Sequence, residues 1–105
     1  MKDVFQRGIG VTQELSHDGH SNIRLCRDRL FGLWIADRLG KDGLAAAAYA
    51  ADIAAENFDS SGDIYMLHRV RTDLRSAGIH LTVPDLLTQL SKAEIAARTE
   101  AFRPM

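Results

Sequence analysis

The chain has 105 residues, of which 13 are Lys or Arg and 14 are Asp or Glu, so its formal net charge at pH 7 is −1. This length is enough for about one small domain with a single core. The charge balance offers no chain-wide attraction for a polyanion, so we do not expect a nucleic-acid partner. Apolar residues make up 46% of the chain, but no uninterrupted apolar stretch approaches the roughly 18 residues of a membrane span. We therefore expect a soluble protein that does not insert into a membrane.

The N-terminal stretch contains Gly8, Gly10 and Gly19 and has no continuous apolar face. We expect residues 1–21 to form an arm that is flexible or only partly helical in the free protein, and residues 22–103 to form a bundle within the single domain 1–105. The stretch also lacks the apolar run of a secretory signal, and Cys26 is the only cysteine. Both features favour a reducing cytoplasm.

The first predicted helix runs from about residue 22 to residue 39, where apolar residues recur at spacings of three and four. A helix that is apolar on two sides belongs in the centre of a bundle. Arg24 and Asp28 are spaced to form an ion pair on its polar side, and Gly40 is suited to end it. The two apolar stripes are Ile23, Cys26, Leu30, Leu33 and Trp34, and Phe31, Ile35 and Leu39.

The second predicted helix, from residue 42 or 43 to about Phe58, is rich in alanine and can approach a neighbour closely. Tyr49 and Ile53 lie on a face beside its main apolar face. Gly32 costs the first helix about 1 kcal/mol relative to alanine, which suggests a close contact at that point. We expect the second helix to be the partner, near Phe31 and a mostly buried Trp34. The main apolar face is predicted to consist of Leu44, Ala48, Ala51, Ala55 and Phe58.

A third helix is expected after Ser60 or Ser61, either of which could cap it, and Gly78 is suited to end it. The fourth begins at Thr82, with Pro84 in its first turn and Asp85 placed to complete a capping box. The inward residues are predicted to be Ile64, Leu67, Val70 and Leu74 in the third helix and Leu86, Leu87, Leu90, Glu94 and Ala97 in the fourth. No segment alternates like a strand, so the fold class is all-α, a four-helix bundle with a flexible N-terminal segment.

Catalytic and metal-binding patterns are weak. His17, Asp18, His20 and Cys26 are metal-type ligands without the paired spacing of a zinc site, so we predict no metal and no cofactor. Cys26 as a nucleophile needs a base, and nothing places His68 or His80 beside it. The arginines of the third helix, including Arg69, Arg71 and Arg75, are more typical of a solvated helix than of a phosphate site. We therefore expect binding rather than catalysis, with an enzyme using Cys26 or the histidines as a minor alternative.

Three stretches resemble the alphaproteobacterial family that includes the zeta inhibitor subunit of the F-type ATP synthase. They are RDRLFGLWIADRLG at 27–40, AYAADIAAENFD at 48–59 and LHRVRTDLRSAGIHLTVPDL at 67–86. The resemblance implies a four-helix bundle without enzyme activity, whose N-terminal segment enters the catalytic head of the ATP synthase and blocks ATP hydrolysis. The residues that carry it are Arg27, Leu30, Phe31, Gly32, Leu33, Trp34, Ala36, Tyr49, Ala50, Arg69, Val70, Asp73, Leu74, Ala77 and Gly78.

Residues 1–21 depart from the family pattern. Gly8 and Gly10 replace helix-forming residues, and Gly19 and His20 stand where two glutamates are usual. About two residues are also missing before Ile23, so weakened inhibition is expected. The resemblance assigns partner binding to Phe5, Arg7, Val11, Leu15, His17 and Asp18, and the predicted structural core includes Gly32, Trp34, Tyr49, Phe58, Val70 and Leu74.

Two functional hypotheses follow. The first is a zeta-type inhibitor that acts in the cytoplasm, at the inner-membrane surface only through its contact with the ATP synthase. The second is a paralogue that keeps the bundle as a binding module for another protein or a small ligand.

Overall fold

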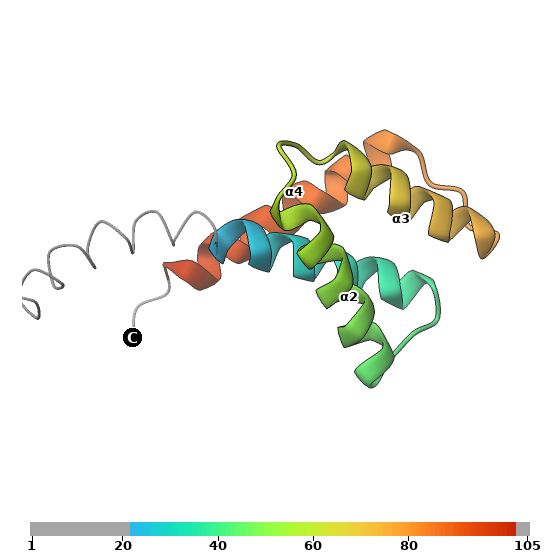
Figure 1. The fold of residues 1–105 in the computed structure, drawn as a ribbon, viewed down its shortest axis with the longest axis horizontal. Coiled ribbons are helices and arrows are strands. Elements are labelled where there is room, and N and C mark those ends of the chain that lie inside the picture. Colours follow the sequence, from blue (N-terminus) through green and yellow to red (C-terminus); the bar gives the residue numbers. More distant parts are fainter. Residues whose placement is uncertain (1–21, 103–105) are drawn as a thin grey trace, which may run out of the picture.

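The computed structural model describes residues 22–102, and within that range every regular element is an α-helix. The first helix occupies residues 22–38 and is followed by α2 (Gly43–Phe58), α3 (Ile64–Ser76) and α4 (Val83–Ala101). In Figure 1 the first helix, in blue and cyan, lies in the middle of the bundle and α2, in green, crosses it. The predicted all-α, four-helix fold is confirmed. The predicted arm, residues 1–21, lies outside the described residues.

The first helix and α3 end in the same way, at glycines with a positive φ of 81°. After the first helix, the N–H of Lys41 donates to the carbonyl of Ala36 at 2.9 Å, and after α3 the N–H of Ile79 donates to the carbonyl of Leu74 at 2.8 Å. This bond from the second residue after the cap to the last turn is typical of the Schellman motif, which requires a left-handed residue. Gly40 and Gly78 therefore end these helices as predicted.

The two predicted N-terminal caps have different outcomes. At α4, the Thr82 hydroxyl accepts from the N–H of Asp85 at 3.2 Å, and the Asp85 carboxylate accepts from the N–H of Thr82 at 2.9 Å. This confirms the capping box. At α3 the cap residue is Asp63 and makes no side-chain cap bond, so the prediction of Ser60 or Ser61 was wrong. The Asp63 carboxylate binds other residues instead, as described below.

The core lies between all four helices. Gly32, Tyr49, Val70 and Leu74 are buried, as predicted. A Cβ added to Gly32 would lie 2.8 Å from the Cα of Ala50 on α2. That is too close for any side chain, so the glycine permits the contact between the first helix and the alanine-rich helix. The main cluster consists of Phe31, Ile35, Ala36, Tyr49, Ile53, Met66, Val70, Leu74, Leu86, Leu90 and Ala93.

In the first helix, Phe31 and Ile35 of one stripe are fully buried, and Leu39 at the end of that stripe is partly buried. On the other stripe, Leu33 is 37% exposed, and Trp34 is only partly buried at the edge of the core. Most of the Trp34 surface is nevertheless covered, so the prediction of a mostly buried Trp34 is confirmed. The guanidinium of Arg38 lies 4.6 Å from the centre of the Trp34 ring and covers part of it. A cation stacked on an aromatic face can replace part of the apolar packing that the ring would otherwise need.

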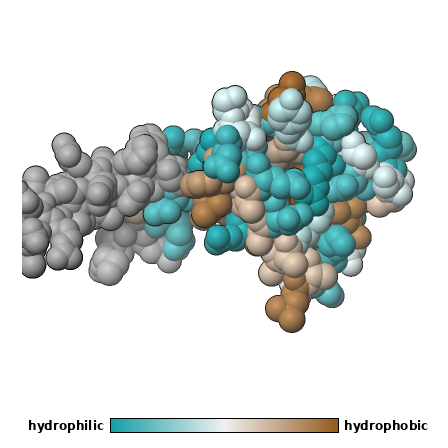
Figure 2. Space-filling model, viewed as in Figure 1, coloured by the Kyte–Doolittle hydropathy of each residue, from teal (hydrophilic) through white to brown (hydrophobic). Residues whose placement is uncertain are grey.

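The predicted main face of α2 was also wrong. Leu44 is 89% exposed and Phe58 is 48% exposed, whereas the face with Tyr49 and Ile53 is buried. Figure 2 shows hydrophobic atoms at the N-terminal end of this helix, at the bottom of the view. Alanine occurs on every side of α2, so the predicted orientation depended only on its few larger residues. The close contact at Gly32 instead buries the face that carries Tyr49 and Ile53.

Smaller corrections apply to α3 and α4. Ile64 is 74% exposed and Met66 takes its place in the core, while Leu87 is 45% exposed. Ile64 lies in the first turn of α3, before the first buried residue, Met66. Leu87 directly follows the buried Leu86 and therefore lies about 100° around α4 from it.

Candidate functional site

The six residues predicted to bind a partner, Phe5, Arg7, Val11, Leu15, His17 and Asp18, all lie outside the described residues. The nearest described part of the chain is the start of the first helix, where the arm joins the bundle. The side chains that hold the start of this helix form the candidate site.

A network of charged and amide side chains surrounds the start of the first helix; we call it the junction cluster and define it as Arg24, Arg27, Asp28, Asn57 and Asp63. The Arg27 guanidinium donates to Asp28 Oδ1 at 2.8 Å and to Asp63 Oδ1 at 2.8 Å. The Asn57 amide donates to Asp28 Oδ2 at 2.9 Å and to Asp63 Oδ1 at 3.0 Å. The cluster thus ties the first helix to the end of α2 and the start of α3.

Asp28 is 1% exposed and lies at the centre of this cluster. The predicted surface pair between Arg24 and Asp28 was wrong, because Asp28 turns inward to Arg27 and Asn57. Arg24 instead donates to the backbone carbonyls of Asn57 at 2.9 Å and Ser60 at 2.8 Å. A buried carboxylate is tolerated only when it is paired and hydrogen-bonded, and Asp28 meets both conditions.

The charges of the junction cluster shift each other's pKa values. Burial alone would raise the pKa of Asp63, but hydrogen bonds from Asn57 and Arg27 and the nearby positive charges lower it overall. Burial alone would likewise lower the pKa of Arg27, but the hydrogen bonds and charges of Asp63 and Asp28 raise it overall. Both groups therefore stay ionised near neutral pH, which suits a structural network rather than proton transfer.

The fourth helix also contributes to this junction, because Glu94 lies 3.6 Å from the Arg27 guanidinium. The start of the first helix is thus fixed to three other parts of the bundle.

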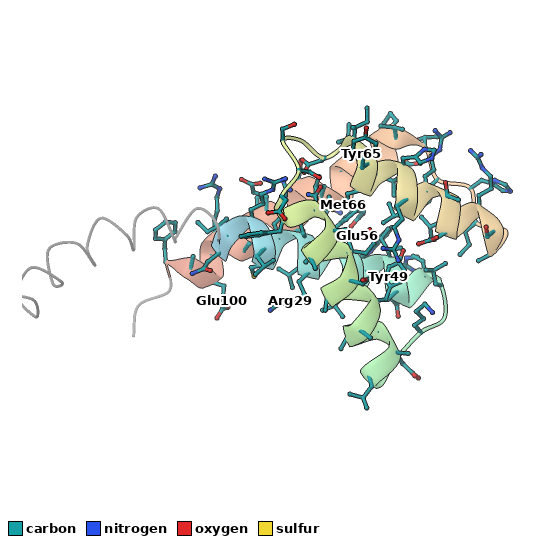
Figure 3. The ribbon with its side chains drawn as sticks, in the orientation of Figure 1. Arg29, Tyr49, Glu56, Tyr65, Met66 and Glu100 are labelled. Carbon is teal, nitrogen blue, oxygen red and sulfur yellow. The ribbon has the colours of Figure 1, made fainter. Side chains whose placement is uncertain are left out.

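A second polar contact joins α2 to α3. The Tyr49 hydroxyl donates to Asp73 at 2.7 Å, and Arg69 lies 2.6 Å from Glu56 and 3.0 Å from Asp52. In Figure 3 Tyr49 and Glu56 project from α2 on the side of α3. Burial, the hydrogen bond to Asp73 and the charge of Asp73 raise the pKa of Tyr49 well above its ordinary value. This hydroxyl is thus held as a donor and is not a proton acceptor at physiological pH.

Within residues 22–102, no hydrogen bond joins Cys26 to His68 or His80. Cys26 is partly buried, whereas His68 and His80 are exposed on α3 and in the segment after it. Among the described residues no group of three or more His, Cys, Asp or Glu side chains could hold a metal ion. None of the helices described is long and apolar enough to cross a membrane.

Comparison with protein families gives a match to the description "ATPase inhibitor subunit zeta" over residues 1–100. The chain belongs to this family. The match includes both the bundle and residues 1–21, so the zeta-family resemblance is confirmed over nearly the whole chain. No curated protein and no solved structure matches it. Membership of the zeta family indicates a regulatory protein that inhibits an ATPase.

The family resemblance included some of the residues that make the polar contacts of the junction cluster and of the α2–α3 contact, and missed others. Arg27 and Asp73 belong to the resembling motifs and make the contacts described above. The roles of Asp28, Asn57 and Asp63 were not predicted. One signal could have indicated them: Asn57 is a polar residue of low helix propensity near the end of an alanine-rich helix, where only a specific hydrogen bond favours it.

Proposed function

We propose that this zeta-family protein binds the catalytic head of the F-type ATP synthase through its N-terminal arm and limits ATP hydrolysis. The family match over residues 1–100 supports this proposal, because it includes the arm as well as the bundle. The junction cluster supports it further, since it gives the arm a rigid base. In this proposal the bundle has no catalytic role, and contact with the membrane surface is made only through the ATP synthase.

The arm residues proposed to contact the head are Phe5, Arg7, Val11, Leu15, His17 and Asp18. An arm that becomes helical on binding must offset its ordering cost, and each glycine in place of a helix former adds nearly 1 kcal/mol. Three glycines, at positions 8, 10 and 19, therefore cost roughly 2 to 3 kcal/mol, or about 30- to 150-fold in affinity. We accordingly propose that inhibition by this protein is weak.

The test is the rate of ATP hydrolysis by the purified catalytic head as the protein is added. The natural chain is compared with a variant in which Gly8, Gly10 and Gly19 are replaced by alanine. The variant is expected to inhibit at a concentration about 30- to 150-fold lower, because alanine favours the helix. Circular dichroism establishes that both proteins are folded.

Two results would contradict the proposal. Complete inhibition by the natural chain at stoichiometric concentration would show that the glycines do not weaken it. No inhibition and no binding by either folded protein would favour the alternative of a bundle that binds another partner.

A further inference from the structure

A groove lies between α3 and the start of α4, on surface that the proposed arm contacts do not use. It has a volume of about 450 Å³ and is lined by Asp63, Ile64, Leu67, His68, Arg71 and Val83. Ile64 is 74% exposed and Val83 is 38% exposed. Figure 2 shows hydrophobic surface at the upper edge of the molecule, near the starts of these two helices. The groove therefore offers apolar side chains to whatever occupies it.

Two arginines lie at the end of this groove and in the pocket next to it. A smaller pocket of about 120 Å³ shares Arg71 with the groove and is also lined by Arg75, Ile79, His80, Leu81 and Thr82. Neither Arg71 nor Arg75 has an ion-pair partner between residues 22 and 102, in contrast to Arg24, Arg27, Arg38, Arg69 and Arg98. The buried Nε of Arg71 also has no hydrogen-bond partner there.

The acidic groups nearest to this surface are already bound. Asp63 accepts from Arg27 and Asn57, and Asp85 accepts from the N–H and hydroxyl of Thr82. Arg71 and Arg75 are four residues apart on one helix face, a spacing at which like charges destabilise a helix. Arg75 lies in the last turn, where the helix dipole favours a cation, but Arg71 lies one turn earlier. The charge at Arg71 is therefore uncompensated within the described bundle.

The apolar and cationic parts follow one face of α3. From Ile64 to Arg75, with Leu67 and Arg71 between them, α3 has 12 residues and rises by about 16 Å at 1.5 Å per residue. That length matches about three turns of a second helix lying in the groove. The groove is apolar at its start and positive at its end, so it fits a segment that is apolar at one end and acidic at the other.

We propose that this groove binds a helical segment of the catalytic head that carries apolar side chains at one end and carboxylates at the other. The apolar end packs on Ile64, Leu67 and Val83, and the carboxylates pair with Arg71 and Arg75. This proposal rests on the proposed function for the identity of the partner. The bundle then holds the protein on the head independently of the arm.

The test measures binding of the full chain to the immobilised purified catalytic head. The double variant Arg71→Glu with Arg75→Glu is expected to bind about tenfold more weakly or worse, and its affinity should depend less on salt concentration. The matched control is Arg29→Glu with Lys92→Glu, which makes the same change in net charge at two exposed positions away from the groove. The control should bind within about twofold of the natural chain.

A second variant tests the groove independently, in case the first variant does not fold. Ile64→Ser removes an apolar side chain that is 74% exposed, so the fold should tolerate it while binding still weakens severalfold. If the natural chain binds the head and the folded groove variants bind equally well, the groove proposal is wrong and the proposed function stands. If the natural chain does not bind the head at all, both proposals fail together.

Discussion

Two groups of arginines in this small bundle have opposite electrostatic environments. In the junction cluster, Arg27 lies 2.7 Å from Asp28 and 2.8 Å from Asp63, and its side chain is 11% exposed. Along the α3 groove, Arg71 and Arg75 have no acidic partner among the described residues. Removing the partner of a buried, paired arginine destabilises the fold, whereas an arginine that stays unpaired beside an apolar groove is available to a partner. This difference predicts that substitutions in the junction cluster destabilise the bundle far more than substitutions along the groove.

Replacing Asp28 with alanine should have the largest effect on stability. The change leaves the positive charge of Arg27 partly uncompensated and removes an acceptor of Asn57, both in a buried site. Breaking a buried pair in this way costs about 3 to 5 kcal/mol. Urea denaturation measures the loss, with Asp37→Ala as the control because the Asp37 side chain is 73% exposed and pairs only with Arg38 at 3.7 Å. A loss below about 1 kcal/mol would mean that the junction cluster does not hold the bundle together.

Replacing Gly32 with leucine should have the next largest effect, because the first helix must approach α2 closely for Asn57 to reach Asp28. The new side chain would meet the backbone of Ala50, and the overpacking should cost about 1 to 3 kcal/mol. The control is Gly62→Leu, since nothing lies within 4 Å of a Cβ at Gly62. An unchanged melting temperature for the Gly32 variant would contradict the close contact.

The lowered pKa of Asp63 predicts a smaller effect that depends on pH. A carboxylate whose pKa is lower in the folded state stabilises the fold above its unfolded pKa, and that stability is lost as the pH falls through the folded value. The ordinary value is 3.8, so the loss should occur at and below about pH 4. The Asp63→Asn variant should be less stable than the natural chain at pH 6 and should lose less stability on acidification. Thermal unfolding at several pH values tests this, and parallel curves for the two proteins would rule out a contribution from Asp63.

Replacing Arg71 and Arg75 together with glutamine should have the smallest effect on stability. Because the two like charges are four residues apart, their removal should leave the free energy of unfolding unchanged or raise it by a few tenths of a kcal/mol. Urea denaturation of this variant beside an Arg27→Gln variant gives the direct comparison between the two groups of arginines. A loss above about 1 kcal/mol for the double variant would show that the groove arginines stabilise the bundle through contacts within it.

Local signals in the sequence predicted the helix ends well. Gly40 and Gly78 end their helices because a left-handed residue is needed there, and Thr82 with Asp85 forms the capping box through neighbouring backbone groups. Gly32 was also predicted correctly, because a glycine inside an apolar helix has few explanations other than close packing. The family resemblance placed Tyr49, Val70 and Leu74 at motif positions, and all three are buried as predicted. Periodicity alone placed Val70 and Leu74 inward but put Tyr49 beside the face expected to be buried.

Neighbouring residues thus predict the helices, the glycines that end two of them and the capping box of α4, and three longer stretches predict the family. The packing of the bundle selects which face of α2 is buried, because alanine on every side gives that helix no strong preference. It also decided that Asp28 turns inward while Arg71 and Arg75 stay unpaired, since each carboxylate could have paired with several arginines. That choice depends on residues brought together from four helices, and spacing along one helix cannot predict it.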